Sequence, residues 1–405
     1  MTTEVLQDAM FSTDQIKALH EAHILNTYGA RKLSLVRGEG CTVWDAEGNE
    51  YLDCMAGIAV ASLGHCHPDV TDAIVRQAQT LVHTSNLYYI QQQGELAALL
   101  CKHSFAQKWF FANCGATANE AAIKLARRYW AQQGTPRPTI VTMNQSFHGR
   151  TLATITATAQ PKYQEGFEPL VPGFKHVEYN DLDALERALT PDVGAILVEP
   201  IQGEGGVRVP DGGYFRGVRA LCDKANVLLL LDEVQVGMGR TGKLFCHEHD
   251  EIAPDVITLA KALGNGVPIG AMGCTDKVAS GFSVGSHAST FGGNPLSTAA
   301  ALATLKVMVQ PGFLDAVTQT GNHFKLGLQS LASKHAQIVD VRGKGLILGM
   351  ELNAPVAPVV QAMLQKNIII GNAGPNTLRF VPPLIISTDA VDRVIETLDQ
   401  VLGTL

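Results

Sequence analysis

The feature of this sequence that most constrains its fold is a set of short apolar runs that contain no polar alternation. They occupy residues 194–199 (GAILVE), 226–233 (NVLLLLDE) and 255–261 (DVITLAK). A strand with one face in water alternates apolar and polar residues, whereas a strand in a parallel sheet is covered on both faces and is apolar throughout. We therefore predict that these runs are central strands of a mainly parallel sheet.

Helical segments lie between and around these runs. Residues 181–189 and 214–224 place apolar residues at helical spacing, and residues 294–309 predict a further helix. The tetrapeptide TANE at 117–120 has the spacing of a capping box, which predicts a helix that opens at Thr117. Strands and helices that alternate in this way are typical of an α/β fold.

The pattern changes near Pro311 to a helix, several short strands and a terminal helix from about Thr388. The predicted short strands cover residues 338–341, 346–350 and 378–380. A chain of 405 residues is long enough for two domains. We expect a large domain of residues 61–310 and a smaller α+β domain of residues 311–405, to which residues 1–60 contribute.

The charge pattern argues against polyanion binding. Lys and Arg total 31 against 38 Asp and Glu, for a formal net charge of −7, and the basic residues form no cluster. Such a chain lacks the electrostatic footprint of a protein that binds nucleic acid or an anionic membrane. The opening MTTEVLQDAM lacks the basic and apolar regions of a secretory signal, and no apolar stretch approaches about 18 residues. We expect a soluble cytoplasmic protein.

One glycine-rich segment imitates two nucleotide-binding motifs. GMGRTG at 237–242 matches a dinucleotide-binding fingerprint and, with Lys243, part of an ATPase phosphate loop. It follows an acidic strand end and precedes KLFCHEHD instead of an amphipathic helix, and Leu244 stands where an ATPase needs Ser or Thr. A nicotinamide-dependent dehydrogenase and an ATPase are therefore disfavoured.

Two short segments are rich in potential metal ligands. HCH at 65–67 and CHEHD at 246–250 have neither the HExxH spacing nor a partner pair elsewhere, and the eight cysteines form no CxxC pair. We expect no metal site, no disulfide framework, and histidines that are hydrogen-bonded within the loops and the core.

Asp232 and Lys261 are the strongest pair of candidate catalytic residues. Each closes a predicted strand, so both belong to the carboxyl edge of the sheet, where ligands of open parallel sheets gather. Pyridoxal phosphate needs a lysine for its Schiff base, an acid that keeps its ring nitrogen protonated, and a phosphate site. Gly115 and Ala116, at the start of the predicted helix, can supply that site through backbone N–H groups and the helix dipole.

Six longer motifs follow one another along the chain: NCGATANEAAIKLAR, FHGRT, VEPIQGEGG, LLLDEVQVGMGRTG, LAKALGNGVPIGA and STFGGNPL. Together they resemble the class III pyridoxal-phosphate aminotransferases, and the similarity runs from about Tyr28 to Leu384. The resemblance implies an α/β protein of fold type I, with a mainly parallel sheet in the large domain and a smaller α+β domain built from both chain ends. It also implies pyridoxal 5'-phosphate as cofactor and a homodimer with active sites at the subunit interface.

The resemblance assigns roles around the cofactor ring. Lys261 would bind the cofactor covalently and then move the proton between the substrate Cα and the cofactor, and Asp232 would pair with the pyridinium nitrogen. Gln235 would hydrogen-bond the ring hydroxyl, and Phe147 would stack on the ring face.

At the phosphate, the resemblance implies Gly115 and Ala116, with Thr290 reaching in from the partner subunit. Cys114 stands where relatives usually have a serine, and Thr117 replaces a common glutamate. A thiol is a weaker hydrogen-bond donor than a hydroxyl, so we expect the Cys114 side chain to stabilise the phosphate less than a serine would.

At the substrate, Arg379 would clamp the α-carboxylate, for which a planar guanidinium is suited. Arg150 would face the distal end, and Glu204 would pair with the carboxylate-binding arginine and control its availability. Ile58 lies where the ornithine-specific members have a tyrosine that orients a free amino acid, and an apolar residue there suits an acylated distal group.

The expected reaction is therefore transamination of N-acetyl-L-ornithine with 2-oxoglutarate, which gives N-acetyl-L-glutamate 5-semialdehyde and glutamate, as in arginine biosynthesis. Succinylornithine, ornithine and 4-aminobutyrate are the amino donors of other members and remain alternatives. One residue does not separate the two acyl groups, and biosynthetic and catabolic members share these motifs.

Overall fold

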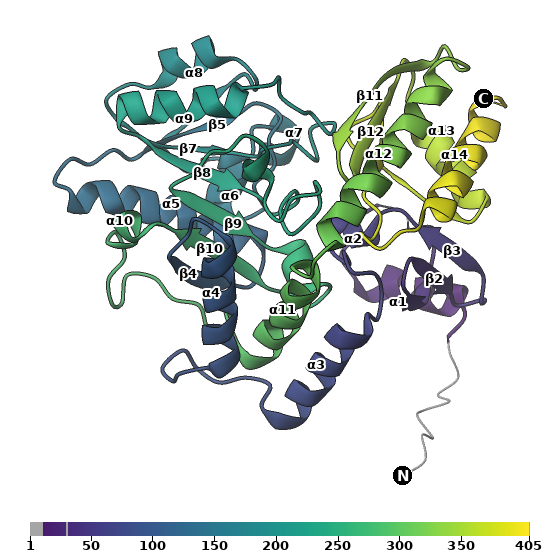
Figure 1. Ribbon diagram of the computed structural model, residues 1–405, viewed down its shortest axis with the longest axis horizontal. Helices are drawn as coiled ribbons and strands as arrows, with labels where there is room; N and C mark the ends of the chain where they lie inside the picture. The colour runs from purple at the N-terminus through teal and green to yellow at the C-terminus, as the bar shows by residue number, and fades with distance from the viewer. Residues whose placement is uncertain (1–10, 30, 405) are drawn as a thin grey trace.

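The computed structural model describes residues 11–29 and 31–404. Its larger body is built on a seven-stranded sheet with the strand order β4-β10-β9-β8-β7-β5-β6 (Figure 1). The strands are β4 (Lys108–Ala112), β5 (Thr139–Met143), β6 (Phe174–Val177), β7 (Val193–Val198), β8 (Leu228–Asp232), β9 (Val256–Leu259) and β10 (Gly270–Cys274). Five of them, β6, β5, β7, β8 and β9, pair in parallel, and β10 is antiparallel to both β9 and β4. The mainly parallel α/β sheet is confirmed, and the three apolar runs form β7, β8 and β9.

Helices cover both faces of the central strands. Alternate residues of β7 and β8 share a buried cluster with α5 (Gly115–Gln132): Ala195, Leu197, Leu228 and Leu230. The residues between them share a cluster on the opposite face with α9 (Tyr214–Ala225): Ile196, Val198, Leu229 and Leu231. Burial on both faces is the reason that these strands contain no polar alternation.

Helix α5 begins at Gly115 and not at Thr117 as the capping-box pattern predicted. Cys114 is the N-cap residue, and its backbone N–H donates to Oγ1 of Thr117 at 3.1 Å. The hydroxyl of Thr117, in the first turn of the helix, therefore accepts a hydrogen bond from the backbone N–H of the residue that precedes the helix. As a result, Gly115 and Ala116 lie in the first turn.

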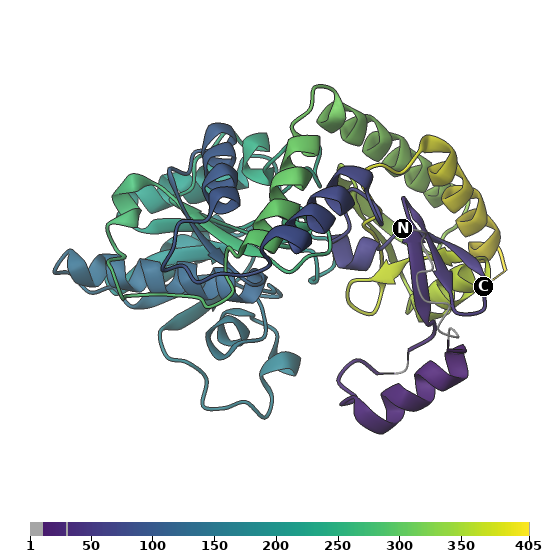
Figure 2. The same ribbon diagram turned by 90° about the horizontal axis from the view of Figure 1, so that it is seen from below.

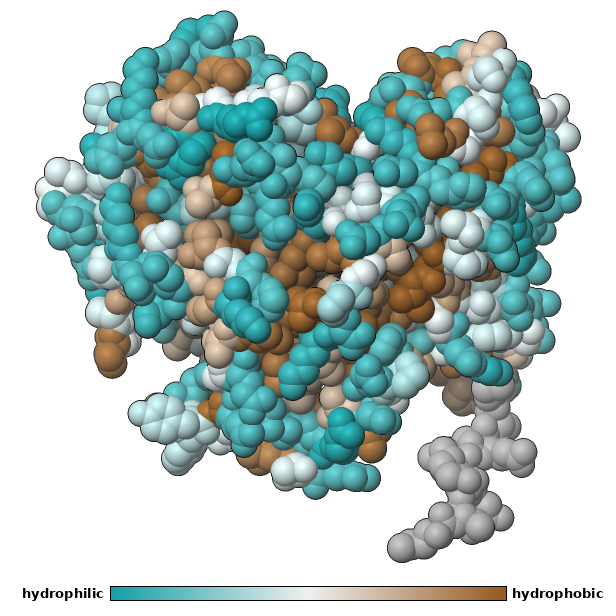
Figure 3. Space-filling view, viewed as in Figure 1, coloured by the Kyte–Doolittle hydropathy of each residue, from teal (hydrophilic) through white to brown (hydrophobic). Residues whose placement is uncertain are grey.

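The other helices of this body surround the sheet and its loops. They are α3 (Pro68–Thr80), α4 (Gln91–His103), α6 (Leu152–Ala157), α7 (Pro161–Gln164), α8 (Leu182–Ala188), α10 (Asp276–Ala279) and α11 (Pro295–Met308). The Asn294 side chain caps α11 by accepting from the backbone N–H of Ser297 at 2.9 Å. Figure 3 shows apolar side chains gathered across the middle of the face on which α11 lies.

The smaller body combines both ends of the described chain (Figures 1 and 2). One sheet has the order β11-β12-β15-β14, from β11 (Ile338–Lys344), β12 (Ile347–Leu352), β14 (Gly371–Asn372) and β15 (Thr377–Phe380). The other has the order β1-β2-β3-β13, from β1 (Leu35–Glu39), β2 (Thr42–Asp45), β3 (Glu50–Asp53) and β13 (Ile368–Ile369). Because β13 pairs in parallel with β3, residues near the two ends of the chain share one sheet.

Helices complete this smaller body. They are α12 (Phe313–Ala332), α13 (Ala357–Gln365) and α14 (Thr388–Leu402), the last beginning where the sequence predicted. Helix α1 (Thr13–His23) lies to one side of the β1–β3 strands in Figure 2, and none of its residues is buried.

Arg240, in the glycine-rich loop that follows β8, joins the two bodies. Its side chain is 0% exposed and donates to Ser62 Oγ at 2.9 Å and to the carbonyl oxygens of Leu346 at 2.9 Å and Pro382 at 2.5 Å. Burial lowers the pKa of Arg240 to about 9. The segment that imitates a nucleotide-binding motif is thus a structural junction, and it leads into a short 3₁₀ turn, η1 (Cys246–His249).

Within the described residues, no single helix is both long and apolar enough to cross a membrane. Helices α11 and α12 satisfy that length and composition test only when taken together, and the chain bends by 73° between them.

Candidate active site

Asp232 and Lys261 meet at the carboxyl edge of the large sheet. Asp232 ends β8, and its register partner Thr258 lies in β9, from which the chain continues to Lys261. Both side chains line a cavity of about 440 Å³. Burial lowers the pKa of Lys261, which makes the neutral, nucleophilic amine more available. The structure thus brings together the two residues that the strand ends predicted.

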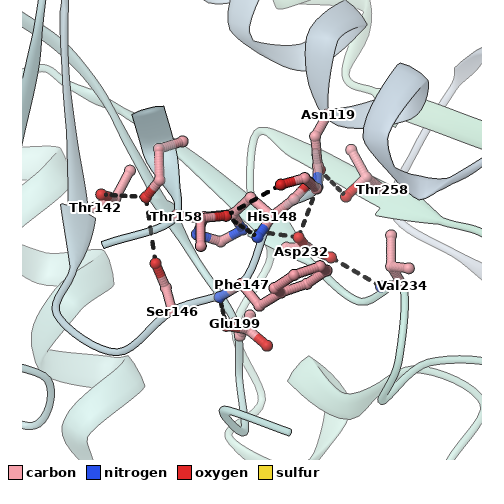
Figure 4. A network of polar contacts seen from close by, with 12 residues as sticks. Asn119, Thr142, Ser146, Phe147, His148, Thr158, Glu199, Asp232, Val234 and Thr258 are labelled. Carbon is pink, nitrogen blue, oxygen red and sulfur yellow. Dashed lines mark hydrogen bonds and ion pairs between the residues drawn. The ribbon is translucent and has the colours of Figure 1, made fainter. Parts of the chain in front are cut away.

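Asp232 is a buried carboxylate surrounded by hydrogen-bond donors (Figure 4). Its Oδ2 accepts from Nδ2 of Asn119 at 2.7 Å and lies 2.8 Å from Nδ1 of His148. Its Oδ1 accepts from the backbone N–H of Val234 at 3.0 Å. These donors fix the orientation of the carboxylate.

Phe147 and Glu199 form another wall of the same cavity. The backbone N–H of Phe147 donates to Oε1 of Glu199 at 2.8 Å. Burial, together with the nearby charge of Asp232, raises the pKa of Glu199 well above its ordinary value.

The start of α5 lines the cavity with Cys114, Gly115 and Ala116. A Cβ added at Gly115 would lie 2.7 Å from Cγ1 of Val234, closer than real contacts allow. Glycine is therefore required for the first turn of α5 to approach the loop after Asp232, and it leaves the N–H groups of that turn at the cavity wall.

Arg379, in β15, and Glu204 are not among the residues that line this cavity, but both hydrogen-bond Gln235, which lines it. Nη1 of Arg379 donates to Oε1 of Glu204 at 2.5 Å, and Nε2 of Gln235 donates to the same oxygen at 3.2 Å. Burial acts to raise the pKa of Glu204, but the facing guanidinium outweighs it, and the pKa lies below its ordinary value.

Arg150 lies at another part of the cavity wall and is exposed to solvent. Its guanidinium carbon lies 4.0 Å from the ring centroid of Tyr163 and 5.7 Å from that of Phe147. Stacking on these rings holds the cation in place without a carboxylate partner.

Ile58 and Thr290 do not line this cavity in the single chain. Ile58 is 44% exposed in the turn α2 (Ala56–Ala59), where its φ is 68°, a left-handed value that is rare for a β-branched residue. Val60, the residue after this turn, lines the cavity instead. Thr290 is exposed in the loop before α11.

Histidines of the two segments that are rich in potential metal ligands lie beside carboxylates. No group of three or more His, Cys, Asp or Glu side chains within residues 11–29 and 31–404 is arranged to hold a metal ion. His65 and His247, from the two segments rich in such ligands, lie 2.8 Å from carboxylate oxygens of Asp53 and Glu233.

Comparison with known proteins identifies the family. The model of the family described as aminotransferase class-III matches residues 26–402. The chain belongs to the class III aminotransferases. The resemblance carried by the six sequence motifs is thereby confirmed.

Individual class III aminotransferases match over their whole length. The acetylornithine aminotransferase of Thermosynechococcus vestitus is 51% identical, covering 98% of this chain and 98% of its own. That of Caldanaerobacter subterraneus subsp. tengcongensis is 49% identical, covering 95% and 98%. Among solved structures, an ornithine aminotransferase from Toxoplasma gondii with partial occupancy of PLP (pyridoxal phosphate) at its active site superimposes with a TM-score of 0.93 at 33% identity, covering 97% of this chain and 95% of that one.

Class III aminotransferases use pyridoxal phosphate, and the side chains of this cavity suit that cofactor. The cavity offers a lysine whose pKa is lowered and an oriented carboxylate that retains acceptor capacity on Oδ1. It also offers the N–H groups of a helix start and an aromatic ring. These are the groups that an aldehyde, a ring nitrogen, a phosphate and a flat heterocycle require.

Sequence reasoning missed Asn119, His148 and Glu199 as members of this aminotransferase site. Each lies inside a motif that was noticed: Asn119 in TANE, His148 in FHGRT, and Glu199 at the end of an apolar run. For Asn119, the available signal was its position one helical turn beyond the phosphate segment, where a polar side chain faces the end of a neighbouring strand.

Proposed function

We propose that this class III aminotransferase transfers the distal amino group of N-acetyl-L-ornithine to 2-oxoglutarate, as in arginine biosynthesis. The products are N-acetyl-L-glutamate 5-semialdehyde and glutamate. The observation that carries the proposal is the near-complete match to an acetylornithine aminotransferase, 51% identical over 98% of both chains, in a protein whose cavity holds the carboxylate that ends β8 and a lysine two residues beyond β9.

When it is bound, pyridoxal phosphate supplies an electron sink for the bonds at the amino-bearing carbon. Lys261 would hold the cofactor through its aldehyde and would carry the proton to and from that carbon. Its lowered pKa supports this role, because an amine that exchanges protons near neutral pH must be neutral for part of the cycle. Asp232 provides the negative charge opposite the ring nitrogen.

The two substrates place different demands on the cavity, because glutamate reacts at the carbon that bears its α-carboxylate, whereas N-acetylornithine reacts at the far end of its side chain. The α-carboxylate of N-acetylornithine therefore lies at the distal end of the cavity. We assign the α-carboxylate of glutamate to Arg379, whose guanidinium Glu204 already engages and can share. We assign the distal carboxylate of glutamate to Arg150, which lies on the cavity wall without a carboxylate partner in the described residues. Ile58 stays a proposed contributor to acyl-group selection.

A substrate comparison tests the proposal. The purified holoenzyme is assayed with N-acetylornithine, N-succinylornithine, ornithine and 4-aminobutyrate, each with 2-oxoglutarate as acceptor. We expect the highest kcat/KM with N-acetylornithine. A preference for succinylornithine would change the assigned acyl group, and a preference for ornithine or 4-aminobutyrate would overturn the proposal.

We further propose that the protein is a homodimer in which Thr290 contributes to the phosphate site of the partner subunit. Support comes from neighbouring apolar side chains that the single chain leaves exposed: Leu87 (87%), Tyr88 (69%), Tyr89 (107%) and Phe291 (59%). The Asn86 amide donates to the carbonyl oxygens of Ser289 and Gly292, which ties the two loops into one surface. Sedimentation analysis of the holoenzyme should give twice the chain mass, and a monomer that retains full activity would contradict the shared site.

We propose the division into residues 61–310 as the cofactor-binding domain and residues 311–405 with 1–60 as the small domain. The parallel pairing of β13 with β3 supports the second grouping. We also propose a cytoplasmic location, supported by eight cysteines that are all free, as is usual where thiols stay reduced.

A further inference from the structure

The two oxygens of Asp232 have unequal surroundings. Oδ2 has two side-chain donors, Nδ2 of Asn119 at 2.7 Å and Nδ1 of His148 at 2.8 Å. Oδ1 accepts only the backbone N–H of Val234, at 3.0 Å. A carboxylate oxygen can accept two hydrogen bonds, so Oδ2 is saturated and Oδ1 keeps one acceptor position.

The orientation of the Asn119 amide is determined by Thr258. Oγ1 of Thr258 donates to Oδ1 of Asn119 at 2.7 Å, and Nδ2 of Asn119 donates both to Asp232 and to the carbonyl oxygen of His148, at 2.8 Å. A reversed amide would place its oxygen against two acceptors and its nitrogen against the threonine hydroxyl. Asn119 and Thr258 are 1% and 0% exposed, so water cannot replace the lost partners.

The His148 ring is also held in a single arrangement. Its backbone N–H donates to Oγ1 of Thr158 at 2.8 Å, and its carbonyl oxygen accepts from Asn119 (Figure 4). Because the Asp232 carboxylate can only accept, Nδ1 of His148 carries the hydrogen. Its Nε2 is buried and has no partner in the described part of the chain. The ring therefore contributes one polar contact, a donor to Asp232.

We propose that Thr258, Asn119 and His148 are positioning residues that hold the Asp232 carboxylate with one acceptor position on Oδ1 reserved for the ring nitrogen of the bound cofactor, and thereby determine whether that nitrogen is protonated. The inference rests on the proposed function, because it takes pyridoxal phosphate as the occupant of the cavity. Donors that saturate Oδ2 make the carboxylate a weaker base, so a shared proton stays on the ring nitrogen. Without them, the proton shifts toward Asp232 and the attraction between the ring cation and the carboxylate is lost.

Thr258→Val is the sharpest variant, because it removes only the hydroxyl and keeps a β-branched side chain in a buried strand. Thr258→Ser restores the hydroxyl. The matched control is Thr142→Val, in β5, whose hydroxyl is equally buried but donates to the carbonyl oxygen of Ala157. His148→Phe is a second, independent variant, because it deletes the donor to Asp232 while Nε2 has no partner to lose.

The experiment measures equilibrium binding of two probes to each cofactor-free protein. One probe is pyridoxal phosphate, and the other is its carbocyclic analogue, which has the same aldehyde, hydroxyl and phosphate but a C–H in place of the ring nitrogen. We expect Thr258→Val and His148→Phe to weaken the binding of pyridoxal phosphate by about tenfold, which corresponds to the loss of roughly one charge-assisted hydrogen bond. The same variants should change the binding of the analogue by less than twofold. Thr258→Ser and Thr142→Val should bind both probes as the wild type does.

Equal weakening of both probes would show that the network has only a structural role, and unchanged binding of both would show that it has none. Either result overturns the inference and leaves the proposed function intact. A wild-type protein that binds no pyridoxal phosphate would overturn both. Thermal unfolding of each cofactor-free variant identifies any protein that has not folded, and the inference then depends on the other variant.

Discussion

Nη1 of Arg379 lies 2.5 Å from Oε1 of Glu204, and the two side chains are only 3% and 24% exposed. Arg379 is therefore already engaged by a carboxylate of its own chain before any substrate arrives. The α-carboxylate of glutamate or 2-oxoglutarate must share or displace Glu204, so this ion pair sets part of the apparent affinity for these two substrates.

Glu204→Gln should tighten 2-oxoglutarate binding and weaken the fold. The neutral amide no longer competes for the guanidinium, so KM for 2-oxoglutarate should fall several-fold. The buried arginine loses its counter-charge, which should cost about 1–3 kcal/mol of unfolding free energy. Steady-state kinetics and thermal unfolding measure the two effects, with Glu204→Asp as the charge-preserving control. A higher KM together with unchanged stability would contradict the assignment.

The stability difference between wild type and Glu204→Gln should depend on pH. The pKa of Glu204 is lowered in the folded protein, so its ion pair contributes stability above the ordinary value of 4.5 and loses it as pH falls through the lowered value. The difference in Tm should therefore be largest near neutral pH and shrink below about pH 4.5. A difference that grows on acidification would show the opposite sign of coupling.

Lys261→Ala should abolish turnover, by roughly 10³-fold or more, and leave a folded protein that still binds cofactor through the start of α5. In the wild-type holoenzyme, borohydride reduction followed by peptide mapping should place the pyridoxyl group on Lys261. Because burial lowers the pKa of this amine, it should react with the cofactor aldehyde at a pH where ordinary lysines remain protonated. A label on another lysine would refute the assignment.

Asp232→Asn should retain cofactor but lose about 100-fold in rate, because an amide cannot hold the ring nitrogen protonated. The structure shows that this substitution should also destabilise the folded protein. Three donors face this side chain, and an amide offers a single oxygen, so its NH₂ group must face at least one donor. Thermal stability of the cofactor-free variant should therefore fall as well, and a variant within threefold of the wild-type rate would exclude Asp232 as the ring partner.

Arg150→Ala should slow both half-reactions by roughly 10- to 100-fold, because glutamate presents its side-chain carboxylate and N-acetylornithine presents its α-carboxylate at the distal end of the cavity. Single-turnover kinetics with each amino donor measure the two rates. Lys162→Ala is a suitable control, since its Nζ lies 4.7 Å from the same Tyr163 ring but the residue does not line the cavity. Unchanged rates in both half-reactions would remove Arg150 from this role.

The sequence was informative where one physical requirement dominates a segment. Burial on both faces produced the unbroken apolar runs of β7, β8 and β9, and the carboxyl edge of a parallel sheet brought Asp232 and Lys261 to one cavity. The helix predicted at 294–309 is α11, and the structure shows that Asn294 is its N-cap residue.

The sequence was less informative where the tertiary structure overrides local preference. Nothing in AGIA predicts that Ala56, Ile58 and Ala59 adopt φ values of 49°, 68° and 59°, each of which costs about 1–2 kcal/mol for an L-residue. The turn is held from outside, because Oδ1 of Asp53 accepts the backbone N–H groups of Met55 and Ala56. Asn119 and His148 were missed for a related reason, since their roles depend on contacts with Asp232 that only the folded sheet creates.

The pairing of β13 with β3 has a consequence for the order in which the protein assembles. Strands β1, β2 and β3 can pair with one another as soon as they leave the ribosome, but the outer edge of β3 stays open until residues 368–369 have been made. At typical translation rates of 5–20 residues per second, that interval lasts roughly 15–60 s. During this time the nascent chain carries an unpaired β edge on β3, which leaves these early strands open to pairing with other chains.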